Sequence, residues 1–182
     1  NISLILSHAL AAEYLGKKLL FIEAGSNSNY PVSTEIVKKI SLSLKIPIMV
    51  GGGIKTIKDV RSALLAGGDK VLINSELINN PKIIEEIAGI FGSQCIVAGI
   101  DYKIDSMSEE KIVYKECGKR MTNETPLKYA KKLESCGVGE ILLNSIDNDG
   151  MMQGYDIDLI KNFSSALQIP VIACGGAGNF MH

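Results

Sequence analysis

Six short apolar runs recur along the chain and alternate with stretches in which apolar and polar residues follow a helical period. The runs are nearly continuous rather than alternating, which is typical of parallel strands that are covered on both faces. They predict strands over residues 19–25, 46–52, 70–74, 95–101, 140–146 and 170–176. The amphipathic stretches predict helices over residues 3–16, 33–45, 56–68, 80–92, 125–137 and 156–167.

One segment interrupts this alternation. Residues 101–124 contain a polar turn around Asp105–Glu110, and a second strand-like run, "KIVYKEC", follows it. We therefore expect a β-hairpin that extends from the strand ending at Asp101.

The regular succession of strand and helix, with glycines after several strands, predicts a (β/α)8 TIM barrel that forms a single domain over residues 1–182. An open doubly wound sheet is the alternative, but no G-x-G-x-x-G follows a first strand. The pattern shows fewer than the eight strands of a closed barrel. We therefore predict a truncated barrel without its first and last strands, whose open sheet edges favour self-association.

Composition narrows the class of protein. A net charge of −1 argues against nucleic acid and anionic membranes as partners, and the apolar runs are too short to span a membrane. The 4 cysteines form no C-x-x-C pair and have no histidine nearby, so we do not expect a zinc site or another metal site. We expect no cofactor either. Cys95 and Cys174 lie in apolar runs and are expected to be buried. This cysteine usage fits a reducing, cytoplasmic setting.

Two similar glycine corners follow predicted strands. "IPIMVGGGIKT" places Gly52 and Gly53 after one strand, and "IPVIACGGAGN" places Gly175 and Gly176 after another. In parallel barrels the carboxyl ends of the strands carry the functional site, and glycine there lets backbone N–H groups approach a phosphate. The pair of corners predicts phosphate binding, with tight turn formation as the alternative explanation.

Polar side chains mark the other strand ends. Asn74, Ser75 and Asn144 carry amides and a hydroxyl that suit a phosphate or substrate cradle. Asp101 and Asp149 are predicted as general acid/base residues, because they place carboxylates at the mouth of an apolar barrel. Asp147 is a weaker candidate, since aspartate also caps turns.

Five blocks of the sequence resemble a known family. The blocks "IPIMVGGGIKT", "GGDKVLINSELINNP", "FGSQCIVAGIDYK", "GVGEILLNSIDNDGMMQGYD" and "IPVIACGGAGN" are similar, in order, to the cyclase subunit of imidazole glycerol phosphate synthase. The resemblance covers about residues 44–182. It implies a heterodimer with a glutaminase subunit that supplies ammonia. It also implies a bisphosphorylated aminoimidazole carboxamide ribonucleotide as substrate, converted to imidazole glycerol phosphate and the carboxamide ribotide.

The resemblance also implies roles for individual residues. Asp101 matches one of two catalytic aspartates of the family, and Asp149 matches the neighbourhood of a phosphate site. The phosphate residues that it implies are Gly53, Asn74 and Ser75 at one site and Gly150, Gly175 and Gly176 at the other, while Gly52 and Asn144 are candidates from the strand ends alone. The charged residues of an ammonia gate and partner interface that it implies are Asp69, Lys70 and Glu140.

The sequence departs from this family at several positions. The first-strand segment with the other catalytic aspartate is absent, and Lys18 stands where the gate has a glutamate. Asn144 stands where threonine is usual, and Cys174 where serine is usual. "LLNSIDNDGMMQGYD" resembles a paralogue associated with amidation of surface-glycan sugars. Residues 8–53, with "EAGS", resemble geranylgeranylglyceryl phosphate synthase, a prenyltransferase. These two activities and an inactive barrel fragment are the alternatives to the cyclase.

Overall fold

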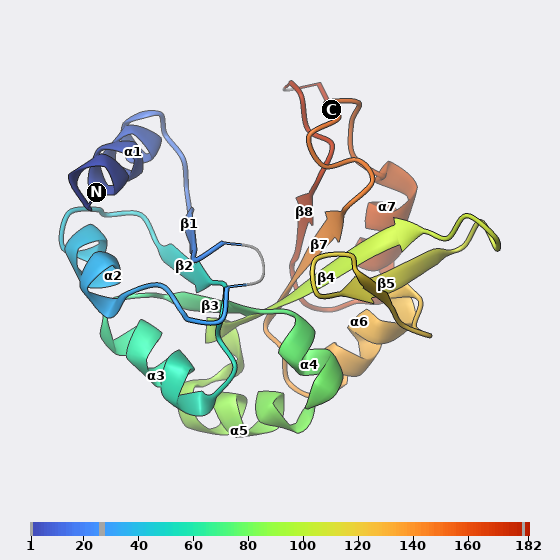
Figure 1. Ribbon diagram of the computed structural model, residues 1–182, viewed down its shortest axis with the longest axis horizontal. Helices are drawn as coiled ribbons and strands as arrows, with labels where there is room; N and C mark the ends of the chain where they lie inside the picture. Colours follow the sequence, from blue (N-terminus) through green and yellow to red (C-terminus); the bar gives the residue numbers. More distant parts are fainter. Residues whose placement is uncertain (1, 26–27, 180) are drawn as a thin grey trace. The chain divides into compact units, whose positions relative to one another are not determined.

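The computed structural model describes residues 2–25, 28–179 and 181–182. It has an α/β fold of parallel strands with intervening helices, and the chain divides into two compact units, residues 1–73 and 74–182. The predicted class, a truncated (β/α)8 barrel fold, is confirmed by this succession of parallel βα elements within each unit (Figure 1). That the whole chain forms one domain stays a prediction.

The first unit contains three parallel strands in the order β1–β2–β3. Its core is formed by Val37 and Ile40 of one helix, Val60 of the next, and Met49 and Val50 of the central strand, all buried. The elements are α1 (Ile2–Tyr14), β1 (Leu20–Glu23), α2 (Thr34–Ser41), β2 (Ile48–Gly51), α3 (Ile57–Leu65) and β3 (Lys70–Ile73).

The second unit has β7 between β4 and β8, all three parallel, and an antiparallel hairpin is added to the end of β4. Figure 1 shows this β4–β5 hairpin in yellow-green and olive beside the shorter strands β7 and β8. The elements are α4 (Ser75–Asn79), α5 (Lys82–Phe91), the 3-10 helix η1 (Ser93–Cys95), β4 (Ile96–Ile104), β5 (Lys111–Lys115), β6 (Arg120–Met121), α6 (Pro126–Ser135), β7 (Glu140–Ser145), α7 (Ile157–Ala166) and β8 (Val171–Cys174).

Local chemistry explains where the helices begin. The Thr56 hydroxyl accepts from the Asp59 N–H while the Asp59 carboxylate accepts from the Thr56 N–H, which is a capping box at the start of α3. Pro126 occupies the first turn of α6, where its missing N–H has no intrahelical partner to lose. In α5, Pro81 precedes the helix instead of opening it, so this helix starts at Lys82, two residues later than the predicted range 80–92.

The predicted strands, long helices and hairpin are confirmed, with their ends shifted by a few residues. The pattern did not predict α4 and η1, because elements of one turn are too short to show a period. Cys95 is buried as expected, whereas Cys174 is exposed, and this corrects the prediction. Cys174 is the last residue of a strand whose other residues are only partly covered. No helix within the described ranges is long and apolar enough to cross a membrane.

The Asp156 carboxylate links three elements of the second unit. One oxygen caps α7 by accepting from the Leu159 N–H at 3.2 Å, and the other accepts from the Tyr102 hydroxyl at 3.0 Å and pairs with Lys111 at 2.6 Å. Burial alone would raise the pKa of Asp156, but the hydrogen bonds that it accepts, chiefly from Lys111, outweigh burial and lower it. Burial also raises the pKa of Tyr102 to about 12. The carboxylate therefore ties α7 to β4 and β5 in its ionised form.

Replacing Asp156 with alanine is expected to lower the free energy of unfolding by roughly 2–3 kcal/mol, because one helix cap and a half-buried ion pair are lost together. Chemical denaturation at pH 7 measures this loss. The matched control is Asp158→Ala in the first turn of the same helix, where the side chain is exposed and a change within about 0.5 kcal/mol is expected.

The difference in the free energy of unfolding between wild type and Asp156→Ala is expected to depend on pH. The folded-state pKa of Asp156 lies below its ordinary value of 3.8, so its stabilising effect is fully present above that pH and is lost as the pH falls further. The gap between wild type and Asp156→Ala should therefore close in acid. A gap that stays constant down to acid pH would contradict this assignment.

Each unit has an outer strand with one unpaired edge in the part of the chain described: β1, which pairs with β2, and β8, which pairs with β7. Phe21 on β1 is 38% exposed. Unpaired, apolar strand edges favour pairing with another chain. We expect light scattering to give an apparent mass that rises above one chain with concentration, and a constant single-chain mass would contradict this.

Candidate functional site

Polar side chains of the second unit meet where its parallel strands end. In the strand register, Asp101 of β4 lies beside Asn144 of β7, and Asn144 lies beside Cys174 of β8. Asn74 precedes α4 in the same unit. Parallel strands place their carboxyl ends at one edge, so residues distant in sequence form one row there.

The Asp101 carboxylate is held on both oxygens. Asn74 donates from Nδ2 to Oδ2 at 2.9 Å, and Asn144 donates from Nδ2 to Oδ1 at 2.9 Å. An ionised carboxylate only accepts hydrogen bonds, so both amides must present their nitrogen to it. We call these three residues the Asp101 cluster. The structure thus brings together three of the predicted site residues.

The amide orientation has a consequence for the two asparagines. Oδ1 of Asn74 and Oδ1 of Asn144 are buried and accept no hydrogen bond. A buried acceptor without a partner costs on the order of 1–3 kcal/mol. Such a cost at a strand-end site, incurred twice around one carboxylate, is a reason to look for function there rather than for stability.

Small residues make room for this cluster. A Cβ on Gly99 of β4 would lie 3.2 Å from the Cβ and Nδ2 of Asn74, so glycine allows the Asn74 side chain to approach the strand. Ser145 follows Asn144 and is buried. Gly99 was not predicted from the sequence, because a glycine inside an apolar run carries no local signal of what lies against it.

Ser75 contacts the hairpin. Its Oγ accepts from the Glu116 N–H at 3.0 Å, and next to it Lys115 donates to Asn79 at 3.1 Å. The turn that makes this contact contains Glu116, Cys117 and Gly118, all with positive φ. The Ser75 hydroxyl therefore supports the hairpin through a lone pair, while its own proton is still able to donate.

The turn after β8 packs tightly against the turn after β7. Gly175 and Gly176 are buried with φ of +83° and +110°, and a Cβ on Gly175 would lie against the Ser145 carbonyl and 3.1 Å from Asn144 Oδ1. The Gly154 N–H donates to the Gly176 carbonyl at 2.8 Å. Glycine is thus required here by backbone packing, whatever the N–H groups bind.

The two aspartates of the loop after β7 make different contacts. Asp147 Oδ2 accepts from the Ile104 N–H at 2.9 Å, which fastens the end of β4 and supports the turn interpretation of this residue. Asp149 is exposed, and its N–H donates to the Ser145 carbonyl at 3.0 Å. Gly150 has φ of +77° and open space where a Cβ would be. The hydrogen bonds described around Asp101 do not include Asp149, so its catalytic role stays a prediction.

The glycine corner of the first unit also requires glycine for backbone packing. Gly52 and Gly53 have φ of +76° and +69°, and a Cβ on Gly53 would meet the Tyr30 carbonyl, while one on Gly52 would lie 2.9 Å from the Ala24 nitrogen. The corner therefore needs glycine to pack against the segment that follows β1. Phosphate binding at this corner stays a prediction.

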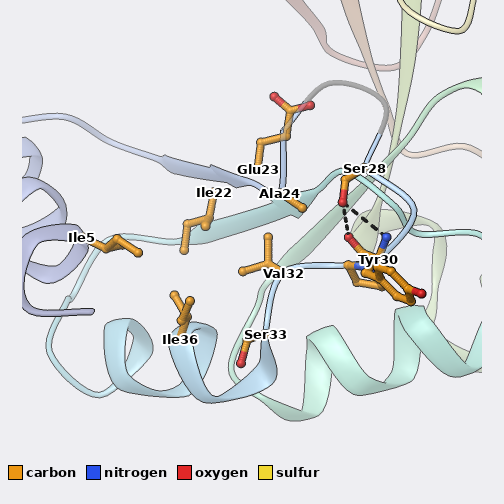
Figure 2. Close-up of a pocket in the computed structure, with 10 residues that line it drawn as sticks. Ile5, Ile22, Glu23, Ala24, Ser28, Tyr30, Val32, Ser33 and Ile36 are labelled. Carbon is orange, nitrogen blue, oxygen red and sulfur yellow. Dashed lines mark hydrogen bonds between the residues drawn. The ribbon is translucent and has the colours of Figure 1, made fainter. Parts of the chain in front are cut away.

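A cavity of about 400 Å³ lies in the first unit between the end of β1, α1 and the start of α2. Figure 2 shows Ile5, Ile22, Val32 and Ile36 turned toward it. The Ser28 hydroxyl donates to the Tyr30 carbonyl at 2.6 Å and shapes the loop beside the cavity. None of these residues was predicted as part of a site; the only signal was the "EAGS" segment.

The predicted gate residues lie at the amino-terminal ends of their strands. Asp69 Oδ2 accepts from the Ile48 N–H at 2.8 Å, and the Asp69 N–H donates to the Ile48 carbonyl at 2.8 Å, which fastens the start of β3 to β2. Lys70 begins β3 in the first unit, and Glu140 begins β7 in the second. Asp69 therefore has a structural role, and the gate function of all three stays a prediction.

Parallel βα elements with a carboxylate at the carboxyl ends of the strands place this chain in the class of (β/α)-barrel proteins. Its sequence matches the family described as "Histidine biosynthesis protein" over residues 10–182. The chain belongs to this family. Across the described residues, no group of three or more His, Cys, Asp or Glu side chains is placed to hold a metal ion.

Two relatives are similar over most of the chain. The imidazole glycerol phosphate synthase subunit HisF of Leptospira biflexa serovar Patoc is 42% identical over 166 residues, which is 91% of this chain. The protein of the same name from Prochlorococcus marinus (strain MIT 9211) is 43% identical over 167 residues, again 91% of this chain. In both cases the chain spans 65% of the relative's length.

Replacing Gly175 with alanine tests the packing of the turn after β8. We expect a loss of at least about 2 kcal/mol in the free energy of unfolding, because the new methyl meets a carbonyl at a left-handed backbone position. Gly89→Ala in α5 is the matched control, since a Cβ at that position would have no other atom within 4 Å. That control should stabilise by about 0.5–1 kcal/mol. Equal stability of Gly175→Ala and wild type would contradict the packing argument.

Proposed function

We propose that this chain carries the cyclase site of an imidazole glycerol phosphate synthase. Membership of the histidine biosynthesis family and the 42–43% identity to HisF subunits support this proposal. The single observation that favours a reactive site is the Asp101 carboxylate at the end of β4, held on both oxygens by amide groups.

In the proposed reaction, ammonia and a bisphosphorylated aminoimidazole carboxamide ribonucleotide give imidazole glycerol phosphate, the aminoimidazole carboxamide ribotide and one water. Asp101 takes part in proton transfer during addition and cyclisation. A carboxylate fixed in one orientation suits this role, because proton transfer requires the acceptor atom to lie within hydrogen-bond reach of the reacting group. Asp149, exposed in the neighbouring loop, is a second candidate for acid/base work.

The two phosphates of the substrate are proposed to bind at the glycine corners. Gly52 and Gly53 form one corner, in the first unit, and Gly150, Gly175 and Gly176 form the other, in the second unit. Support comes from the positive φ angles of these glycines, which turn successive backbone N–H groups in directions that ordinary residues rarely adopt. The Ser75 hydroxyl is a further proposed phosphate donor, since its hydrogen bond from the hairpin uses only a lone pair.

A glutaminase subunit is the proposed partner and source of ammonia. The names of the relatives, which call each a subunit, support an assembly with another chain. Asp69, Lys70 and Glu140 are proposed to face that partner, because they lie at the amino-terminal ends of their strands, whereas the candidate site residues follow carboxyl ends. A cytoplasmic location belongs to the same proposal, since the substrates are phosphorylated metabolites.

Asp101→Asn tests the proposed reaction. With the bisphosphate substrate and an ammonium salt, which replaces the glutaminase, we expect turnover to fall by at least about a hundredfold, because asparagine cannot accept the proton. Absorbance of the substrate and chromatography of the two products measure the reaction.

The matched control is Asp105→Asn, at the far end of the same hairpin, where the carboxylate accepts hydrogen bonds from residues of its own turn, chiefly Ser108. This control should keep turnover within about twofold. Undiminished turnover by Asp101→Asn would refute the catalytic assignment, and absence of turnover by the wild type would refute the proposed function.

A further inference from the structure

Two side chains of the Asp101 cluster contact the proposed reacting group without being reacting groups themselves. We propose that Asn74 and Asn144 are positioning residues that act on Asp101. This inference deepens the proposed function and rests on it for the identity of Asp101 as the reacting group.

The geometry of the carboxylate supports the positioning role. Each oxygen of Asp101 accepts one amide N–H at 2.9 Å, and the two amides come from different elements, the start of α4 and the end of β7. Two donors on two oxygens fix the rotation of the carboxylate about its Cβ–Cγ bond. Each oxygen still has one acceptor site left. Asp101 can therefore accept a proton from a substrate without first breaking its own hydrogen bonds.

The amide oxygens without a hydrogen-bond donor indicate why each amide has the orientation that it has. Turning either amide over would give its oxygen a new environment, but it would place that oxygen against the carboxylate, where both groups only accept. The orientation that leaves the Oδ1 atoms of Asn74 and Asn144 buried without a donor is therefore the one that serves Asp101.

The Asn74 amide keeps one donor beyond this contact. Its Nδ2 donates one N–H to Asp101, and its second N–H and the Ser75 hydroxyl are the donors that can reach another group near this strand end. The positioning role is therefore compatible with the phosphate site predicted at Asn74 and Ser75, which stays a prediction.

Nuclear magnetic resonance tests the arrangement without any turnover. The side-chain NH₂ signals of Asn74 and Asn144 in the ¹H–¹⁵N spectrum should both move upfield in Asp101→Ala, because a charge-assisted hydrogen bond is lost. Unmoved signals in Asp101→Ala would overturn the inference.

Kinetics separates positioning from substrate binding. Asn144→Leu, which keeps the size of the side chain but removes the donor, should lower kcat roughly a hundredfold through misplacement of Asp101. KM should change little, because no direct substrate contact is removed. Asn144→Thr, which restores a hydroxyl donor, should recover part of kcat. Asn162→Leu, exposed on α7, is the control that should keep wild-type values.

The outcomes distinguish this inference from the proposed function. If the wild type does not turn over the bisphosphate while the amide signals respond to Asp101→Ala, the proposed function fails and the positioning arrangement stands. If the wild type is active and Asn144→Leu raises KM with kcat unchanged, Asn144 binds substrate directly and the inference fails. Should Asn144→Leu not fold, the spectra of the wild type and Asp101→Ala decide the question.

Discussion

The end of strand β4 is paired with a neighbouring strand on each side, and the geometry of the candidate site depends on this overlap of two pairings. Asp101 and Tyr102 pair in parallel with β7 and in antiparallel with β5. A residue with both neighbours in place has little freedom of backbone position. Asp101 is therefore set by two independent pairings before its side chain makes any contact, and the amide groups then need to fix only the rotation of its carboxylate.

The same overlap places the hairpin close to the start of α4. Because β5 continues from β4, its turn reaches Ser75, whose hydroxyl accepts from the Glu116 N–H. Lys103 of β4 donates to the Gly118 carbonyl at 3.2 Å, which holds the turn from a second side. The predicted hairpin is thus a support for the strand-end region rather than a separate appendage.

The sequence was sufficient for the order of elements, because continuous apolar runs and helical periods report burial directly. It was also sufficient to place Asp101, Asn74 and Asn144 at strand ends, since a strand's end is visible where its apolar run stops. It was not sufficient for the hydrogen bonds among them, which depend on register between β4 and β7. Gly99 and the cavity beside Ile22 were missed for the same reason, because their neighbours come from distant parts of the chain.

The glycine corners show why one residue type supported two explanations. At Gly53, Gly175 and Gly176 the space of a Cβ faces a backbone carbonyl, so packing alone requires glycine. Packing and anion binding use different sides of the residue, however, since the N–H vector and the Cβ direction diverge. Gly150 differs, because open space surrounds it and only its φ of +77° favours glycine. A glycine whose Cβ space is empty is the more informative candidate for ligand contact in this loop.

Positions 144 and 174 show how a substitution acts through its neighbours in a sheet. Asn144 and Cys174 stand where the family that the sequence resembles usually has hydroxyl residues, and the register places them side by side in one row with Asp101. A hydroxyl donates and accepts at a single atom, whereas an amide separates its donor from its acceptor. With asparagine at position 144, the nitrogen holds Asp101, while the oxygen lies 3.1 Å from where a Cβ on Gly175 would be, so one side chain lies between the carboxylate and the neighbouring turn. A change at position 144 would therefore alter both the orientation of Asp101 and the environment of that turn.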